Sequence, residues 1–246
     1  SNDNGSGVYV NGGTLNLYSG QIANSRGQTG TDSNKSNKYG GGVYVNNGTF
    51  NMYGGTIKNN TSSGGTGKLS FGGAGVYVEA SGNFIMKNAA SVTENTIGYG
   101  STGGAGVYVN GGTFEMNDNA SVTNNIADNS SGSSGGGVFV KGSLTMNDNA
   151  SVSDNKAKNG TLNGGGVYVS GGAFEMNDNA SVTDNKATGY RATLDGGGVY
   201  MGGGTFTMTG RSKVLRNAAS NDKSGKGDGG GVYVSKGSKF EMNGEA

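Results

Sequence analysis

Short runs of alternating apolar and polar residues recur along the whole chain. Between Val167 and Thr183 the runs read V-Y-V, F-E-M and S-V-T, and Gly, Asn, Asp and Ser separate them. An alternation with a period of two is typical of β-strands, and the separating residues are those that favour turns. No window shows the i, i+3, i+4 spacing of a helix. The pattern therefore predicts an all-β chain of short strands.

The same three runs occur in eight copies. V-Y-V or a close variant begins at Val8, Val43, Val76, Val107, Val138, Val167, Val199 and Val232. An F-x-M element or a variant follows in every copy, and seven copies have a third apolar position, at Ile22, Ile57, Val92, Val122, Val152, Val182 and Val214. The distance from V-Y-V to this position is always 14 to 16 residues, whereas the distance onward to the next V-Y-V varies from 15 to 21. One corner of the unit therefore accepts insertions.

Stacked repeats of this kind predict a right-handed parallel β-helix, a solenoid with three short strands per rung and about eight rungs. Each strand would pair with its copy in the next rung about 4.8 Å away, which gives a rod roughly 35–40 Å long. We expect residues 1–246 to form one such domain. An antiparallel β-sandwich also uses short alternating strands, but it does not explain why the same residues recur at matching places.

Each rung has a set of apolar residues that the alternation directs to one side. In the fourth copy these are Val107, Val109, Phe114, Met116 and Val122. Five such side chains are too few to hold a single rung together, because ordering its residues costs more than their burial contributes. The core must therefore be shared between neighbouring rungs.

An asparagine follows the third apolar position by three residues in six copies. Stacked amides can hydrogen-bond from rung to rung, and they also satisfy the backbone groups of turns. We therefore expect an internal, structural Asn ladder and no ligand site here. Its members are Asn60, Asn95, Asn125, Asn155, Asn185 and Asn217.

The middle residue of V-Y-V is aromatic in all eight copies. If the flanking valines point inward, the rings point outward and stack on one face. Such a face could bind carbohydrate, or the rings could simply stack on one another as a structural column. We favour the structural column. A register shifted by one residue would instead place the rings in the core.

Composition excludes several classes of function. A net charge of +1 and the absence of basic runs leave no surface for nucleic acid. The chain has no His and no Cys, which excludes Ser-His-Asp and Cys-His catalysis and thiolate or histidine metal sites. The glycine run at residues 164–166 precedes a strand and not a helix, so it indicates a tight bend and not a phosphate loop. We predict no cofactor.

The two ends of the sequence also carry information. No signal peptide or membrane-spanning segment is visible, so we expect no direct membrane insertion. The chain begins in a loop and stops at Ala246, partway through a repeat. We therefore expect it to be part of a longer protein that continues at both ends.

Three aspartates, Asp118, Asp148 and Asp178, occupy one position in consecutive copies. Carboxylates about 5 Å apart repel each other unless water or a cation lies between them, and calcium favours such clusters of oxygen atoms. Neighbouring copies have Asn88 and Gly210 at this position, with no accompanying stack of Arg or Lys. A solvated turn is the favoured interpretation, and calcium binding stays open.

The insertions line up on one side of a solenoid and would form a continuous variable strip. We refer to them as the loop strip. Within it, Tyr99, Tyr190 and Arg191 are the candidate ligand contacts, because nothing in the repeat requires them. The loop strip comprises residues 26–39, 61–71, 96–102, 126–134, 156–163, 186–195 and 218–228.

Two short motifs support a family resemblance. GGAGV occurs at residues 72–76 and 103–107, and FEMN at residues 114–117, 174–177 and 240–243. With these motifs the chain resembles the right-handed parallel β-helix repeats of bacterial cell-surface proteins, and it is similar to a relaxed form of the chlamydial polymorphic membrane protein repeat with its GGA and FxxN motifs. Most copies have GGG in place of GGA. The resemblance implies a β-helix with an adhesive or spacer role, and it carries over no catalytic residue.

These observations predict a non-catalytic extracellular module of a bacterial surface or secreted protein. It would act as an adhesin or a projecting stalk, and the loop strip would bind a host surface protein or a carbohydrate. The alternative is a carbohydrate-active β-helix enzyme, similar to a polysaccharide lyase or a glycosidase, with a calcium-binding stack of acidic residues. Deep loops that gather Asp, Lys and Arg over one face would favour the enzyme.

Overall fold

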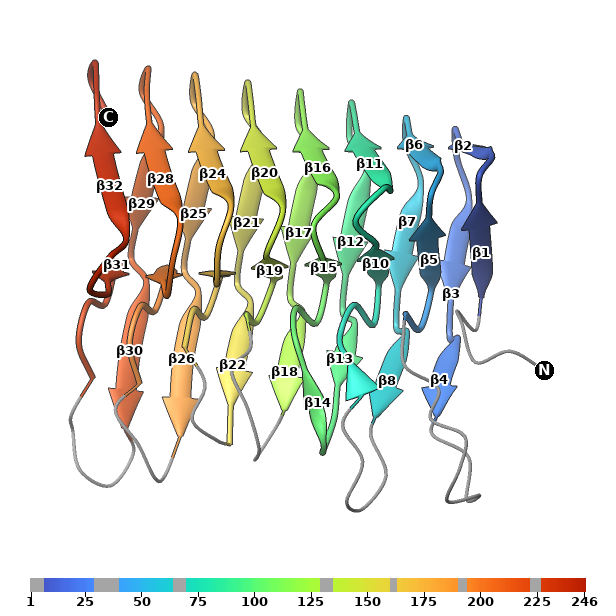
Figure 1. Ribbon diagram of the computed structural model, residues 1–246, viewed down its shortest axis with the longest axis horizontal. Helices are drawn as coiled ribbons and strands as arrows, with labels where there is room; N and C mark the ends of the chain where they lie inside the picture. The colour runs from blue at the N-terminus through green and yellow to red at the C-terminus, as the bar shows by residue number, and fades with distance from the viewer. Residues whose placement is uncertain are drawn as a thin grey trace.

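The chain folds as a parallel β-solenoid. The computed structural model describes residues 7–28, 40–63, 70–128, 135–159, 163–189, 194–221 and 227–246. Within these ranges all regular elements are β-strands, arranged in two parallel sheets of eight strands, two of seven and one of two. Equivalent strands of successive rungs lie side by side along the rod (Figure 1). The fold class predicted from the repeat is confirmed.

The first two sheets correspond to the V-Y-V and F-x-M runs. The first sheet contains β1 (Val8–Asn11), β5 (Val43–Asn46), β10 (Val76–Val78), β15 (Val107–Val109), β19 (Val138–Val140), β23 (Val167–Val169), β27 (Val199–Met201) and β31 (Val232–Val234). The second contains β2 (Thr14–Leu17), β6 (Thr49–Met52), β11 (Asn83–Met86), β16 (Thr113–Met116), β20 (Ser143–Met146), β24 (Ala173–Met176), β28 (Thr205–Met208) and β32 (Lys239–Met242).

The third and fourth sheets form the opposite wall of the rod. The third contains β3 (Gln21–Ala23), β7 (Thr56–Lys58), β12 (Ser91–Thr93), β17 (Ser121–Thr123), β21 (Ser151–Ser153), β25 (Ser181–Thr183) and β29 (Lys213–Leu215). The fourth contains β4 (Arg26–Gln28), β8 (Thr61–Ser63), β13 (Thr96–Ile97), β18 (Ile126–Asp128), β22 (Lys156–Lys158), β26 (Lys186–Gly189) and β30 (Ala218–Asn221). A fifth, two-stranded sheet pairs β9 (Ser70–Phe71) with β14 (Ser101–Thr102).

Like residues stack on like residues in the core. Val107 pairs with Val76 and Val138 in the first sheet, and Phe114 pairs with Phe84 in the second. The rings of Phe84 and Phe114 stack with centroids 4.8 Å apart. All five residues predicted to point inward in the fourth copy are at most 1% exposed. Shared burial between rungs thus supplies the core that no rung has alone.

The fourth sheet corrects the prediction of three strands per rung. The residues after the Asn ladder, assigned from the sequence to the loop strip, begin with a strand in the seven rungs where they are described. Apart from Ile97, its described inward residues, such as Ser62, Ala127 and Ala157, are small, so the period-two alternation is weak there. Because the third and fourth sheets contain seven strands each, the described residues also form slightly fewer complete coils than the eight predicted.

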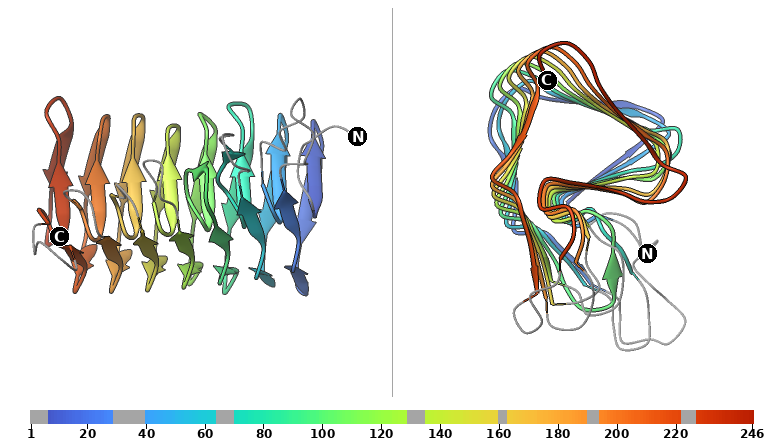
Figure 2. Two further views of the ribbon diagram at one scale, coloured as in Figure 1. Left: turned by 90° about the horizontal axis from the view of Figure 1, so that it is seen from below. Right: turned by 90° about the vertical axis from the view of Figure 1, so that its left-hand side faces the viewer.

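The cross-section has a concave notch where the glycine run passes close to the fourth sheet (Figure 2, right). A Cβ atom at Gly136 would lie only 2.7 Å from the carbonyl carbon of Lys156, so only glycine fits at this crossing. The notch separates the main core from a small second core that includes Ile97 and Ala127. In the same view, which faces the C-terminal end, the chain advances as a right-handed coil.

Candidate binding surface

The predicted Asn ladder lies at the corner between the third and fourth sheets. The residue before each asparagine has a left-handed backbone conformation, for example Asn124 with φ 54° and Asp154 with φ 57°. The corner turns the next side chain inward. Asn60, Asn95, Asn125, Asn155 and Asn185 are completely buried, and Asn217 is half-buried.

Hydrogen bonds run along this ladder from rung to rung. The backbone N–H and the Nδ2 of Asn125 both donate to Asn155 Oδ1, at 2.9 and 3.0 Å. Asn155 donates in the same way to Asn185 Oδ1, and its Nδ2 also reaches the carbonyl oxygen of Val122 at 2.9 Å. With its polar groups engaged inside the wall, the ladder offers nothing to a ligand.

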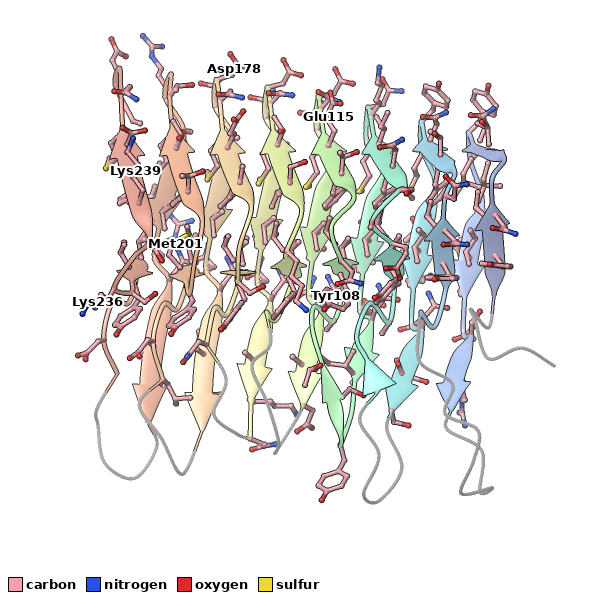
Figure 3. The ribbon with its side chains drawn as sticks, viewed as in Figure 1. Tyr108, Glu115, Asp178, Met201, Lys236 and Lys239 are labelled. Atoms are coloured by element: carbon pink, nitrogen blue, oxygen red, sulfur yellow. The ribbon has the colours of Figure 1, made fainter. Side chains whose placement is uncertain are left out.

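The aromatic column on the first sheet is stacked but largely buried. Its rings point away from the valine core and form a separate cluster, in which Tyr77 and Tyr108 are 1% and 2% exposed. Glycine backbone covers them, since a Cβ at Gly103 would lie 3.3 Å from the Tyr108 ring. Tyr108 can be followed in Figure 3. The expectation of an exposed aromatic face is therefore wrong for the middle rungs, where no sugar could reach the rings.

Tyr99 is the one predicted ligand contact that the structure describes. It lies in a turn between β13 and β14, flanked by Gly98 and Gly100, and its side chain is 57% exposed. The turn is closed by a hydrogen bond of 3.2 Å from the Ser101 N–H to the Gly98 carbonyl oxygen. Ile97 and Ser101, on either side of the turn, are completely buried. The turn thus holds an exposed ring on a firmly anchored base.

The other two predicted contacts, Tyr190 and Arg191, lie outside the described residues. The same is true of much of the loop strip; its described parts are the fourth-sheet strands, β9, the turn at Tyr99 with β14, and the residues just before the glycine runs. That the three contacts act together therefore stays a prediction.

Asp118, Asp148 and Asp178 form a ladder of hydrogen bonds at the turns that follow the second sheet. Asp118 Oδ2 accepts the Asn88 N–H at 2.8 Å, and Asp148 and Asp178 accept the N–H of the preceding aspartate at 2.9 and 3.0 Å. These bonds offset part of the repulsion between neighbouring carboxylates. Within the described ranges, no group of three or more His, Cys, Asp or Glu residues is placed to hold a metal ion.

A second, mixed ladder precedes the glycine runs. The Asp195 N–H donates to Asn163 Oδ1 at 2.9 Å, and Asp195 Oδ1 accepts the Asp228 N–H at 3.2 Å. The Asp195 side chain is only 7% exposed, and burial, together with the charge of Asp228, raises the pKa of its carboxyl group. Burial also raises the pKa of the nearby Tyr200 hydroxyl. Asp195 is buried, whereas Tyr200 belongs to the aromatic column of the first sheet and is half-buried.

An exposed ion pair marks the corner beside the Asn ladder. Arg216 Nε and Nη2 donate to the two carboxylate oxygens of Asp184 at 2.9 and 2.8 Å. The hydrogen bond from Arg216 holds the pKa of the Asp184 carboxyl below its ordinary value. Because both groups are in solvent, the pair contributes little to stability.

Sequence reasoning missed an aromatic pair on the turns after the second sheet, in which one ring is exposed and the other half-buried. Tyr18 is 70% exposed and stacks on Tyr53, with ring centroids 5.0 Å apart and an interplanar angle of 11°. Both residues directly follow the F-x-M element, at a position where later copies have Lys87 or Asn117. This departure from the repeat, a tyrosine where later copies have a polar residue, could have identified the pair from the sequence.

Comparison of the chain with protein families, with curated proteins and with solved structures gives no match. In the described part of the chain there is no helix of the length and apolar character needed to span a membrane. The function must therefore be inferred from the surfaces described above.

Proposed function

We propose that this chain is a non-catalytic extracellular module of a bacterial cell-surface or secreted protein, which acts as an adhesin or a projecting stalk. The rod-like arrangement supports this role, because its rungs repeat a rigid core while one corner varies in length. The GGA and FxxN motifs, which resemble those of chlamydial polymorphic membrane protein repeats, favour the same role.

The observation that carries the adhesive part of the proposal is the turn at Tyr99. The Tyr99 ring is 57% exposed, whereas Ile97 and Ser101 at the two ends of its turn are completely buried. Such an exposed ring contributes little to folding. Because its base is fixed, such a ring loses little conformational entropy when it binds a partner. A host surface protein or a carbohydrate is the proposed ligand, and Tyr190 and Arg191 are the further proposed contacts.

The alternative of a carbohydrate-active enzyme has weaker support. A calcium-assisted site on Asp118, Asp148 and Asp178 would need free carboxylate oxygens that converge on one ion. Instead, one oxygen of each carboxylate accepts a backbone N–H, and the three are spread along the rod. We therefore place the function in binding and not in catalysis.

A screen of glycan and host-matrix arrays tests the proposal. We expect a ligand whose binding is weakened at least about tenfold by Tyr99→Ser, or by Gly-Ser turns grafted in place of two adjacent insertions. Tyr9→Ser is the matched control, since Tyr9 is 44% exposed but lies on the first sheet. Undiminished attachment by folded Tyr99→Ser and grafted variants would contradict the role of the loop strip.

A further inference from the structure

The turns that follow the second sheet form a continuous ridge, which we call the turn ridge. It comprises residues 18–20, 53–55, 87–89, 117–119, 147–149, 177–179, 209–211 and 243–245. It lies at the end of each rung opposite the fourth-sheet strands (Figure 1), and Asp178 marks its tip in Figure 3. The turn ridge is therefore separate from the loop strip.

One part of the turn ridge is aromatic. Tyr18 and Tyr53 stack on each other, and their turns contain small residues, among them Gly20 and Gly54. Tyr18 belongs to the first described rung, and Tyr53 in the second rung is half-buried. At 70%, Tyr18 is the most exposed of the large apolar side chains described.

The other part of the turn ridge is a regular array of amides and carboxylates. Asn177 Nδ2 donates to Asn147 Oδ1 and Asn147 Nδ2 to Asn117 Oδ1, both at 2.9 Å. Beside this row stand Asp148, Asp178 and the exposed amides of Asn119, Asn149 and Asn179. Each exposed amide or carboxylate has more hydrogen-bonding positions than the ladder uses. The array repeats once per rung, about every 4.8 Å.

This combination matches the chemistry of a sugar chain. A sugar presents C–H groups, which pack against aromatic rings, and hydroxyl groups, which pair with planar amides and carboxylates. An extended β-linked glycan advances by a distance close to one rung per sugar unit. We propose that the turn ridge binds an extended, uncharged polysaccharide that lies along the rod, with Tyr18 and Tyr53 against one sugar and the polar array against the next ones.

Charge defines which polysaccharides fit. The charged side chains of these eight turns are two cations and four anions, which gives a net charge of −2: Lys87, Arg211, Asp118, Asp148, Asp178 and Glu245. Arg211 and Glu245 pair with each other at 2.7 Å. Lys87 stands between the aromatic and the polar part, and the three aspartate carboxylates are consecutive. An anionic polymer such as polygalacturonate would be repelled. The turn ridge therefore selects neutral glycans over acidic ones.

Affinity electrophoresis in native gels tests the proposal. The probes are three neutral polymers, namely hydroxyethyl cellulose, mixed-linkage β-glucan and galactomannan, with polygalacturonate as the anionic comparison. We expect at least one neutral polymer to retard the protein and polygalacturonate to have no effect. The double variant Tyr18→Ser, Tyr53→Ser should raise the apparent Kd for that polymer about tenfold.

Matched variants keep the result interpretable. Tyr9→Ser removes an exposed ring from the first sheet, outside both the turn ridge and the loop strip, and should leave retardation unchanged. The ridge variants test the turn ridge alone, whereas Tyr99→Ser tests the loop strip of the proposed function, so the two proposals can fail separately. If the tyrosine variant does not fold, the triple variant Asn119→Ala, Asn149→Ala, Asn179→Ala should weaken retardation about threefold or more. Thermal melts establish folding.

Three outcomes would overturn the proposal. The first is that none of the neutral polymers retards the protein. The second is that the folded ridge variants are retarded as strongly as the unaltered chain. The third is that polygalacturonate retards the protein as strongly as the neutral polymers do.

Discussion

The molecule contains two asparagine ladders that differ in burial and in completeness. In both, amides donate to the next amide at 2.9 to 3.0 Å. Inside the wall, Asn155 is completely buried and also bonds to backbone, whereas the outer Asn147 on the turn ridge is half-buried. The outer ladder ends where Lys87 replaces an amide, which leaves the buried Asn117 Nδ2 without an acceptor. Hydrogen bonds of the same type should therefore contribute more to the free energy of unfolding in the inner ladder than in the outer one.

Asn155→Ala should have the largest effect. It removes the acceptor of the Asn125 N–H and the donor to the Val122 carbonyl oxygen, and these buried groups cannot turn to water. We expect the free energy of unfolding to fall by about 1–3 kcal/mol. Denaturant melts measure the change. A fall in the free energy of unfolding of less than about 0.5 kcal/mol would show that the buried position of the inner ladder does not make its hydrogen bonds more stabilising.

Asn147→Ala, the equivalent change in the outer ladder, should cost less. The partner atoms, Asn117 Oδ1 and Asn177 Nδ2, belong to half-buried side chains. We expect a loss of about 0.5–1 kcal/mol in the same melts. If it destabilised the rod as much as Asn155→Ala does, the contrast between the two ladders would be wrong.

Lys87→Asn should extend the outer ladder and stabilise the protein. The amide oxygen that this change introduces would stand where the repeat places the acceptor for the Asn117 Nδ2 group, which has none now. We expect a gain of about 0.5 kcal/mol, because one buried donor becomes satisfied. The control is Lys87→Ala, which removes the charge without adding an acceptor and should bring no such gain.

Asp195→Asn examines the mixed ladder and should have the smallest effect. The raised pKa of the Asp195 carboxyl means that its contribution to stability is complete below the ordinary Asp pKa of about 3.9 and is lost as pH rises through the raised value. Asparagine can still accept the Asp228 N–H without a charge. The variant should therefore have the higher melting temperature at pH 7, and the difference should shrink towards pH 4. A difference that does not depend on pH would contradict this account.

The sequence predicted the main core because large residues mark it. Positions such as Phe114 and Val122 recur with a nearly fixed spacing, which locates the strands along the chain. The period of two within each strand also predicts which side chains point inward. The fourth sheet was not predicted, because most of its described inward residues, such as Ala157 and Ser62, are small and its strands are only two to four residues long. Its core depends on contacts across the notch, which no local pattern records.

Surface positions were harder to predict than core positions. The outward direction predicted for Tyr108 was right, but the glycine segment just before the strand, at Gly103, passes close to the ring and helps to bury it. Tyr99 could be singled out because it departs from the repeat, and Tyr18 could have been found in the same way. Exposure depends on which segments pass over a residue, and the alternation of strands does not contain that information.

The ladders also determine how the rod would respond to force. Their hydrogen bonds, like those between the strands, run parallel to the line that joins the two ends (Figure 1). Tension between the ends would therefore open one rung at a time, starting from a terminal rung, and would not shear whole sheets at once. Each rung of about 30 residues would release about 100 Å of chain. A module of this kind would lengthen in steps under load and could keep its remaining rungs folded while it yields.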